Sequence, residues 1–258
     1  MTAAPADYWN ERAQRYATRG HGLAAVCSYG MPAFYNRYID VCQRRALAPW
    51  LRMPARPGGA TLDVGCGIGR WSVELARRGH DVTAVDLSPR MLERAETRAR
   101  EAGVACRFEV GDAATLALGR TFDLILCVTV LQHIMEPAVA AAAIERLAAH
   151  VSPTGELVLL EAAPSLATAR CDTASFRART ADWYAEALRR AGLELTARRG
   201  VDPMPLKTWL VPVYRHMPRP LGLTALALST AISLPFDWAF GQAFARYSWH
   251  TVFRARHR

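Results

Sequence analysis

A glycine-rich turn and an acidic residue downstream of it are the first candidates for chemistry in this sequence. The run Leu62-Asp63-Val64-Gly65-Cys66-Gly67-Ile68-Gly69 places glycines between an apolar stretch and a helix-forming segment. Glycine suits a backbone that must take unusual dihedral angles or be approached closely by a ligand, and the helix that follows offers free N–H groups. Asp86 stands 21 residues after Gly65. At the end of a strand, its carboxylate can accept hydrogen bonds from both ribose hydroxyls of a nucleoside.

The elements that must position these residues alternate along the chain. Apolar runs predict strands, and amphipathic segments between them predict helices. This alternation is typical of a doubly wound parallel sheet with helices on both faces. The strands are predicted at residues 61–64, 82–86, 107–110, 124–128, 156–160, 193–198 and 248–255, and the helices at 71–78, 89–102, 137–150 and 182–191. A turn at residues 152–155 is expected to close the third of these helices.

Four ordered motifs together resemble class I S-adenosylmethionine-dependent methyltransferases that modify small molecules. Asp63 with the glycine turn resembles their first motif, and the segment 86–91 resembles the one that holds ribose and adenine. The segment 111–113 resembles the motif that meets the adenine amino group, and 122–134 resembles the fourth. The resemblance implies a Rossmann-like seven-stranded sheet whose last strand enters antiparallel between the fifth and sixth. It also implies S-adenosylmethionine as cofactor, bound by Asp63, Gly65, Gly67, Gly69, Asp86, Leu87, Met91, Asp112, Ala113, Cys127 and, from the N-terminal segment, Tyr16.

Each motif alone also has a purely structural explanation. Asp63 can cap the turn, and Asp86 can cap the helix that Ser88 and the following proline begin. Four motifs in order at compatible spacings favour the nucleoside pocket instead. A nicotinamide-binding turn is disfavoured, because its third glycine would fall on Arg70.

The composition is that of a folded protein with a basic surface. The chain has 258 residues, 51% of them hydrophobic, and a formal net charge of +9. Lys207 is the only lysine, and the arginines are spread along predicted helices, so we expect solvated helix faces and no nucleic-acid partner. The six cysteines are scattered, which predicts reduced thiols and no metal site. Residues 1–15 lack an apolar run, so we expect a cytoplasmic protein. We also expect either a monomer or a homodimer.

Two segments outside the sheet are expected to select the substrate. We expect a helical cap over residues 1–52, with helices at 7–18 and 33–51, a cofactor domain over 59–200, a lid insertion over 201–245 and a final strand within 246–258. The apolar run 221–234 has fourteen residues, whereas a bilayer span needs about twenty. It predicts a pocket wall, with shallow membrane contact as the alternative. The candidate substrate contacts are Tyr35, His21, Trp209 and His216.

The expected reaction is methyl transfer to a small apolar or amphiphilic molecule of specialised metabolism. A base is needed only when the acceptor must lose a proton, and His133 and Glu161 follow the fourth and fifth strands where ligands bind. Each has a structural alternative: His133 can pack against the methionine tail, and Glu161 can be an exposed loop residue. Carbon methylation of a prenyl diphosphate, with Glu161 as base, is one alternative function. A non-catalytic S-adenosylmethionine-binding protein is another.

Overall fold

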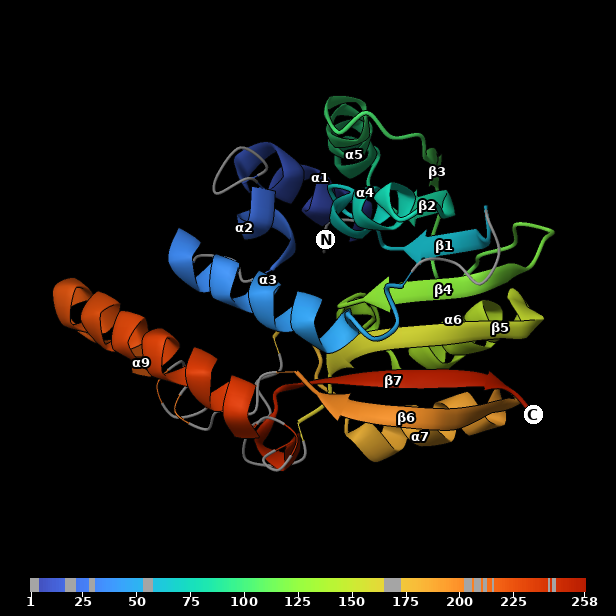
Figure 1. The fold of residues 1–258 in the computed structure, drawn as a ribbon. Helices are drawn as coiled ribbons and strands as arrows, with labels where there is room; N and C mark the ends of the chain where they lie inside the picture. Colours follow the sequence, from blue (N-terminus) through green and yellow to red (C-terminus); the bar gives the residue numbers. More distant parts are fainter. Residues whose placement is uncertain are drawn as a thin grey trace.

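The computed structural model describes residues 5–16, 22–27, 31–52, 58–164, 173–201, 206, 210, 213–214, 216–240, 242 and 245–258. Within them, a seven-stranded sheet has the order β3-β2-β1-β4-β5-β7-β6 (Figure 1). The strands β1 to β5 run parallel, and β7 is antiparallel to both of its neighbours, β5 and β6. This order confirms the predicted Rossmann-like sheet with an inserted antiparallel last strand. The strands are β1 Ala60–Val64, β2 Asp81–Asp86, β3 Arg107–Val110, β4 Phe122–Val128, β5 Val151–Ala162, β6 Leu193–Gly200 and β7 His250–His257.

Helices cover both faces of the sheet, as the alternating pattern predicts. One core joins α6 and α7 to the sheet, with Leu147 and Tyr184 among its fully buried residues. The other joins α3, α4 and α5 to the opposite face, with Leu47 and Leu75 at its centre. Polar caps fix two of these helices, because Ser88 and Thr180 each accept a backbone N–H of the first turn. The helices are α4 Arg70–Arg77, α5 Pro89–Glu101, α6 Pro137–Ala149 and α7 Ala181–Arg190.

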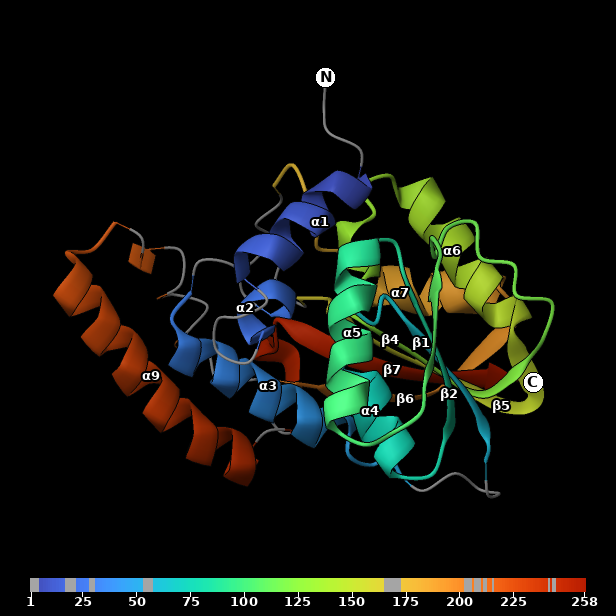
Figure 2. The ribbon, with the colours of Figure 1, turned by 90° about the horizontal axis from the view of Figure 1, so that it is seen from above.

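Within the described residues, four further helices lie at the side where the parallel strands end (Figure 1). They are α1 Pro5–Tyr16, α2 Leu23–Val26, α3 Ala33–Leu47 and α9 Arg219–Phe240. Two 3₁₀ turns, η2 Leu131–His133 and η4 Ala245–Tyr247, join the sheet to its surroundings. Figure 2 shows α9 lying along α3 at the edge of the molecule, while α1 lies against α5. The extra segments therefore gather where an open parallel sheet binds its ligands.

Several predicted boundaries are wrong. The helix predicted at 33–51 ends at Leu47, and the last strand, predicted at 248–255, is His250–His257. Residues 152–155 do not close a helix; they belong to β5, which begins at Val151 and pairs with β4 across an irregularity in register. The apolar run predicted at 221–234 is part of the longer helix α9, which has 22 residues and contains Pro235. Among the described residues, α9 alone is long and apolar enough to cross a membrane by length and composition. This segment is therefore not too short to span a bilayer, contrary to the expectation from residues 221–234.

Candidate active site

A cavity of about 370 Å³ lies at the carboxyl ends of the first strands. It opens among the turn after β1, the turn after β2, the turn after β3 and the segment after β4, as the topology requires. The cavity brings together these predicted residues: Gly65, Gly67, Asp86, Leu87, Met91, Asp112, Ala113 and His133. Four separate sequence motifs therefore meet at one site.

The glycine turn after β1 depends on residues without side chains. Gly65, Gly67 and Gly69 have φ angles of 65°, 54° and 72°, a region that other residues rarely adopt. A Cβ atom on Gly67 would lie 2.8 Å from the Val26 side chain, and one on Gly69 would lie 2.9 Å from the Cβ atom of Ala95. Gly65 and Gly67 thus leave backbone exposed to the cavity. Gly69 instead allows α4 and α5 to pack closely, and it does not line the cavity.

Asp86 is held at the end of β2 by two backbone donors. Its Oδ2 accepts the Gly67 N–H at 2.8 Å, and its Oδ1 accepts the Ser88 N–H at 2.9 Å. Burial raises the pKa of this carboxyl, although both backbone bonds act in the opposite direction. A carboxylate has about four acceptor positions, so each oxygen retains room for another hydrogen bond from the cavity. The geometry suits a ligand with two neighbouring hydroxyl groups.

Asp63 and Cys127 lie behind the cavity wall rather than in it. Asp63 is buried and accepts the Ser72 hydroxyl at 2.6 Å, which joins β1 to α4. Burial raises the pKa of Asp63 to about 6. Cys127 is fully buried in the core beneath α6. The structure therefore gives both residues contacts that support the turn and the sheet, and neither lines the cavity.

Glu161 is also placed behind the wall, where it holds the segment after β4. Its Oε1 accepts the N–H groups of Val130 and Leu131 at 2.9 and 3.0 Å, and its Oε2 accepts that of Gln132 at 3.0 Å. The side chain has no exposed surface and does not line the cavity. Burial raises its pKa to about 7, against the effect of the three N–H groups and of Arg179. This geometry does not favour contact with a substrate.

The same segment is held from its other end by arginine. Arg179 is buried and donates hydrogen bonds to the carbonyl groups of Leu131 and Ile134. Thr129, which lines the cavity, has a φ of 57° and is the non-glycine residue with positive φ among those described. Such strain persists only where the surroundings enforce it, and here Glu161 and Arg179 are the enforcing groups.

His133 reaches the cavity as a neutral ring. Its Nδ1–H donates to the Ser175 carbonyl at 2.6 Å, and its ring meets Trp9 edge-on at a centroid distance of 4.8 Å. Burial lowers the pKa of His133 to about 4, and the charge of Arg12 acts in the same direction. His133 is thus uncharged at neutral pH and contributes a flat wall beside Trp9.

The helix α1 closes the cavity with residues that the motifs did not identify. Trp9 and Arg12 line the cavity, and the Arg12 guanidinium lies 5.2 Å from the Trp9 ring centroid. Asn10 accepts the Ser88 hydroxyl at 2.7 Å, which fastens α1 to the start of α5. Tyr16 does not line the cavity but packs beside the small core that includes Met91. The sequence indicated only that this segment is rich in aromatic and basic residues. That composition could not identify Trp9 and Arg12 as the residues that line the cavity.

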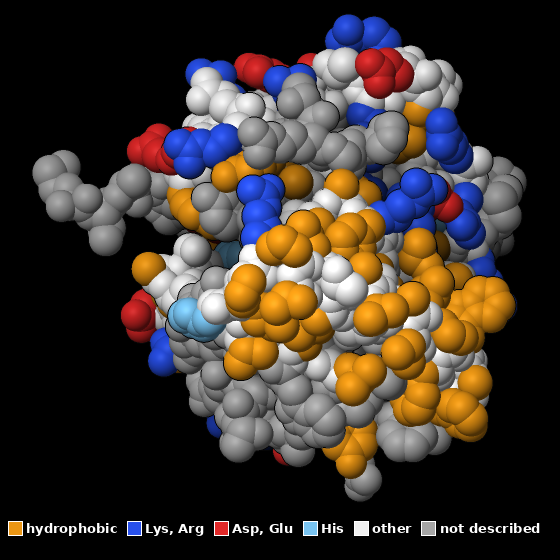
Figure 3. All heavy atoms as spheres, turned by 90° about the vertical axis from the view of Figure 1, so that its left-hand side faces the viewer, with side chains coloured by type: hydrophobic (Ala, Val, Ile, Leu, Met, Phe, Trp, Pro, Cys, Tyr) orange, Lys and Arg blue, Asp and Glu red, His pale blue; other side chains and the backbone are white. Residues whose placement is uncertain are grey.

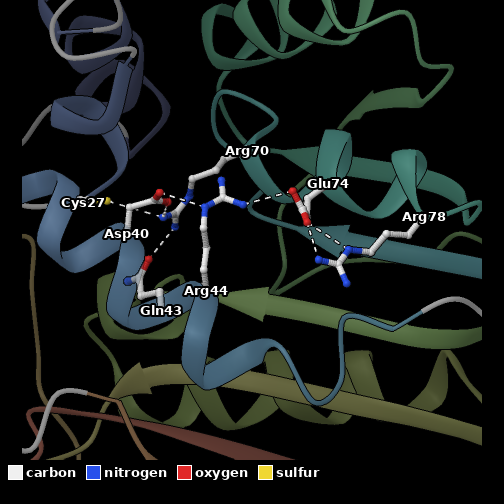
Figure 4. A network of polar contacts seen from close by, with 7 residues as sticks. All are labelled: Cys27, Asp40, Gln43, Arg44, Arg70, Glu74 and Arg78. Atoms are coloured by element: carbon white, nitrogen blue, oxygen red, sulfur yellow. Dashed lines mark hydrogen bonds and ion pairs between the residues drawn. The ribbon is translucent and has the colours of Figure 1, made fainter. Parts of the chain in front are cut away.

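A network of charged residues fastens α3 to α4 (Figure 4). Arg70 donates to Asp40 at 2.6 Å and to Gln43 at 2.7 Å, and its side chain is only 4% exposed. Burial alone would raise the pKa of Asp40, but Arg70 and Arg44 together lower it. Arg44 also reaches Glu74 on α4, at 3.2 Å. Because Arg70 lines the cavity, this network links the cap to the site.

The predicted substrate residues are not brought to the cavity. Tyr35 is buried in the core beneath α3, and His216 is exposed within the predicted lid segment, before α9. His21 and Trp209 lie outside the described residues. Among the residues that the structure describes, no group of three or more His, Cys, Asp or Glu side chains is arranged to hold a metal ion.

Comparison with known proteins gives a domain and a fold. Residues 61–155 match the model of a methyltransferase domain. A ubiquinone biosynthesis O-methyltransferase of Xanthomonas euvesicatoria pv. vesicatoria is 36% identical over 104 residues, which are 40% of this chain and 42% of the relative. This chain therefore matches less than half the length of that relative.

Solved structures extend the likeness to the whole fold. Magnesium protoporphyrin IX methyltransferase from Synechocystis PCC 6803, crystallised with S-adenosylhomocysteine, superposes with a TM-score of 0.63 at 19% identity and covers 98% of both chains. A [4+2]-cyclase has a TM-score of 0.56 at 21% identity, covering 86% of this chain and 80% of its own. At these identities the likeness concerns the fold, and the cyclase shows that the fold does not fix the reaction.

The sheet, the cavity and the matched domain define one class of protein. The sheet is the Rossmann-like sheet of solved methyltransferases, and residues of all four sequence motifs meet at its cavity. Residues 61–155 are similar to a methyltransferase domain, and the fold that surrounds them is similar to that of a solved S-adenosylmethionine-dependent methyltransferase.

Proposed function

We propose that this protein transfers a methyl group from S-adenosylmethionine to a small apolar or amphiphilic molecule. The observation that carries the proposal is the meeting of Asp86 and the glycine turn in one cavity. The site fits the cofactor on two counts. Both oxygens of Asp86 can accept a further hydrogen bond, and the backbone at Gly65 and Gly67 is open where a side chain would otherwise fill space.

The cavity residues divide by the part of the cofactor that each can hold. Asp86 would bind the ribose hydroxyls, and the glycine turn would approach the methionine part through its N–H groups. The adenine would lie between Leu87 and Met91, with Asp112 at its edge. The Asp112 carboxylate is already oriented, since it accepts the Ala114 N–H at 2.9 Å. The cofactor supplies an activated methyl group carried on a sulfonium ion.

The remaining wall of the cavity favours an apolar acceptor. Trp9, Ile134, Met135 and Val139 line most of this wall with the neutral ring of His133, and its charged residues are Arg12, Arg70 and Glu136. Such a surface excludes water and leaves the acceptor poorly solvated next to the sulfonium ion. This favours transfer of the methyl group, because the sulfonium ion loses its charge in the reaction. The chain therefore contributes mainly by orienting the two reactants and excluding water.

Calorimetry with S-adenosylmethionine and S-adenosylhomocysteine tests the cofactor site. Asp86→Asn should weaken binding by about a hundredfold, because two charge-assisted hydrogen bonds are replaced by weaker ones at about 1.4 kcal/mol each. Asp81→Asn is the matched control, since Asp81 lies at the opposite end of β2 and pairs with Arg107 at the surface. Equal affinity of the wild type and Asp86→Asn, or a preference for NAD, would refute the proposal.

Turnover requires a separate test. The protein should transfer label from methyl-labelled S-adenosylmethionine to one or more members of a panel of phenols, amines and prenyl diphosphates. Binding of the cofactor without transfer to a broad panel would favour the non-catalytic alternative. Transfer to prenyl diphosphates alone would identify the carbon-methylating alternative.

A further inference from the structure

The helix α9 turns its apolar side chains away from the protein. The residues that it buries follow one stripe of the helix and are mostly small or polar: Gly222, Leu226, Ser229, Ser233 and Asp237. Six large apolar side chains, in contrast to the buried Leu226, lie on the outside and are 36–68% exposed: Leu221, Leu228, Ile232, Leu234, Trp238 and Phe240. A surface helix in water normally has the reverse arrangement.

Polar contacts fix this orientation of α9. The Tyr38 hydroxyl of α3 donates to Asp237 Oδ2 at 3.0 Å, and both side chains are buried. Arg45, also of α3, donates to the Trp238 carbonyl at 2.9 Å and places its guanidinium 5.1 Å from the Trp238 ring centroid. The helix therefore cannot rotate its apolar face inward without breaking the buried hydrogen bond between Tyr38 and Asp237.

The exposed face of α9 is apolar over its length and basic at its ends. Arg219 and Asp237 are the charged residues of α9, and Asp237 is turned inward. Arg219 begins the helix, and Arg45 lies beside Trp238 near its other end. Figure 3 shows the hydrophobic side chains gathered on this side of the molecule, with Lys and Arg side chains along part of their border. Large contiguous apolar patches of this kind mark interaction sites.

We propose that α9 docks this protein on the surface of an anionic phospholipid membrane. The helix would lie in the plane of the interface, because its inner stripe is packed on α3 and only its outer face can enter lipid. Its exposed apolar side chains would insert among the outer parts of the lipid acyl chains. Trp238 and Arg45 would lie at the level of the headgroups. The net charge of +9 adds attraction to an anionic surface.

The charges argue against a second copy of this chain as the occupant. Two α9 faces packed together would bring Arg219 and Arg45 of each copy into one interface. The acidic residue of α9 could not compensate, because Asp237 is buried against Tyr38. Both copies would also carry a net charge of +9 and repel one another. A surface that supplies negative charge fits better.

The position of α9 relates the membrane to the cavity. In Figure 1, α9 and α3 lie on the side where the parallel strands end, which is also the side of the cavity. An apolar acceptor dissolved in lipid would thus be near the site. The docking itself is independent of the proposed methyl transfer, so it can be tested without cofactor or acceptor.

Flotation with lipid vesicles tests the proposal. The wild type should float with vesicles of phosphatidylcholine and phosphatidylglycerol, and it should bind phosphatidylcholine alone more weakly. The double variant Leu228→Gln and Ile232→Gln should lower the partition coefficient by at least about tenfold, because two half-exposed aliphatic side chains lose their transfer into lipid. Val110→Gln is the matched control, since Val110 is 63% exposed on β3 and should leave vesicle binding unchanged.

Two results would overturn the proposal. The first is failure of the folded wild type to float with either kind of vesicle. The second is a combined result: light scattering finds a dimer for the wild type and a monomer for the double variant, and both proteins bind vesicles equally. In that case α9 would pack on a second copy of the chain. Thermal unfolding of each variant checks that the helix is intact, and Arg219→Gln should reduce the preference for anionic vesicles without abolishing binding.

Discussion

Replacing Glu161 with glutamine distinguishes two roles for this residue: a catalytic base, or a residue that positions the wall of the cavity. Glutamine keeps one carbonyl oxygen, which can still accept the N–H groups of Val130 and Leu131. Its amide nitrogen would face the N–H of Gln132, which Glu161 Oε2 accepts at 3.0 Å, and would leave that buried donor without a partner. The expected cost is about 1–3 kcal/mol of the free energy of unfolding.

This cost should depend on pH. Burial raises the pKa of Glu161 to about 7 from an ordinary value of 4.5. Between these values the folded protein holds a proton that the unfolded chain has released, so the wild type loses stability as the pH rises from about 4.5 to about 7. At about 1.4 kcal/mol for each pH unit, the loss is about 3 kcal/mol. Glutamine does not titrate, so the difference in stability between the wild type and Glu161→Gln should close or change sign over this range.

Urea unfolding at pH 5 and pH 8 measures the gap, and calorimetry with S-adenosylhomocysteine measures the site. Glu161→Gln should weaken cofactor binding, because the segment after β4 loses part of its support. A variant with Arg179→Met should affect the same segment, and the double variant should cost less than the two separate losses together. If Glu161→Gln abolished turnover while stability and cofactor affinity were unchanged, Glu161 would be a base and our interpretation would be wrong.

Two further predictions concern the turn after β1 and the neutral histidine. Gly65→Ala should abolish detectable binding of S-adenosylhomocysteine, because the new Cβ atom would overlap the Val130 side chain. Gly119→Ala is the control, since Gly119 has nearly the same φ but open space around it, and this variant should bind normally. Equal affinities of the two variants in calorimetry would contradict the prediction. The pKa of His133 is lowered to about 4, so the wild type should lose about 3 kcal/mol of stability as the pH falls from about 6.5 to about 4. Urea unfolding of His133→Phe should show a smaller loss over that range, whereas an unchanged pH dependence would show that the ring is protonated in the folded state.

The sheet could be predicted from the sequence because its signals are local. Strand β3 has the predicted bounds, and α5 differs by one residue. The start of β5 could not be predicted in this way. Residues 152–155 contain the residue types of a turn, but β5 pairs with β4 across an irregular register, and this long-range pairing overrides the local preference.

The site could be predicted only as far as its motifs reach. Asp86 and the glycine turn carry recognisable spacing, whereas Trp9 and Arg12 enter the cavity because α1 docks on α5. Glu161 was predicted to follow the fifth strand; it lies inside β5, one residue before the end, and its side chain turns toward the backbone after β4. Side-chain direction at the end of a strand depends on neighbouring elements and not on sequence spacing.

The orientation of α9 is the clearest case of a feature that periodicity could not supply. The apolar run 221–234 predicted a pocket wall, with its apolar side chains buried, but α9 extends to Phe240 and exposes most of them. The helix continues, and its buried face is selected by Tyr38, a residue 199 positions from its partner Asp237. Such a contact becomes visible only after the chain has folded.

The place of β7 in the sheet constrains the order in which the molecule can assemble. Among the described strands, β6 pairs only with β7, and β7 lies between β6 and β5. The chain from β6 through α9 is therefore synthesised before the strand that will attach it to the rest of the sheet. Until residues 250–257 emerge from the ribosome, both edges of β6 are unpaired. The apolar helix α9 is then not yet fixed to the rest of the protein, and a chaperone or a lipid surface can bind it before the sheet is complete.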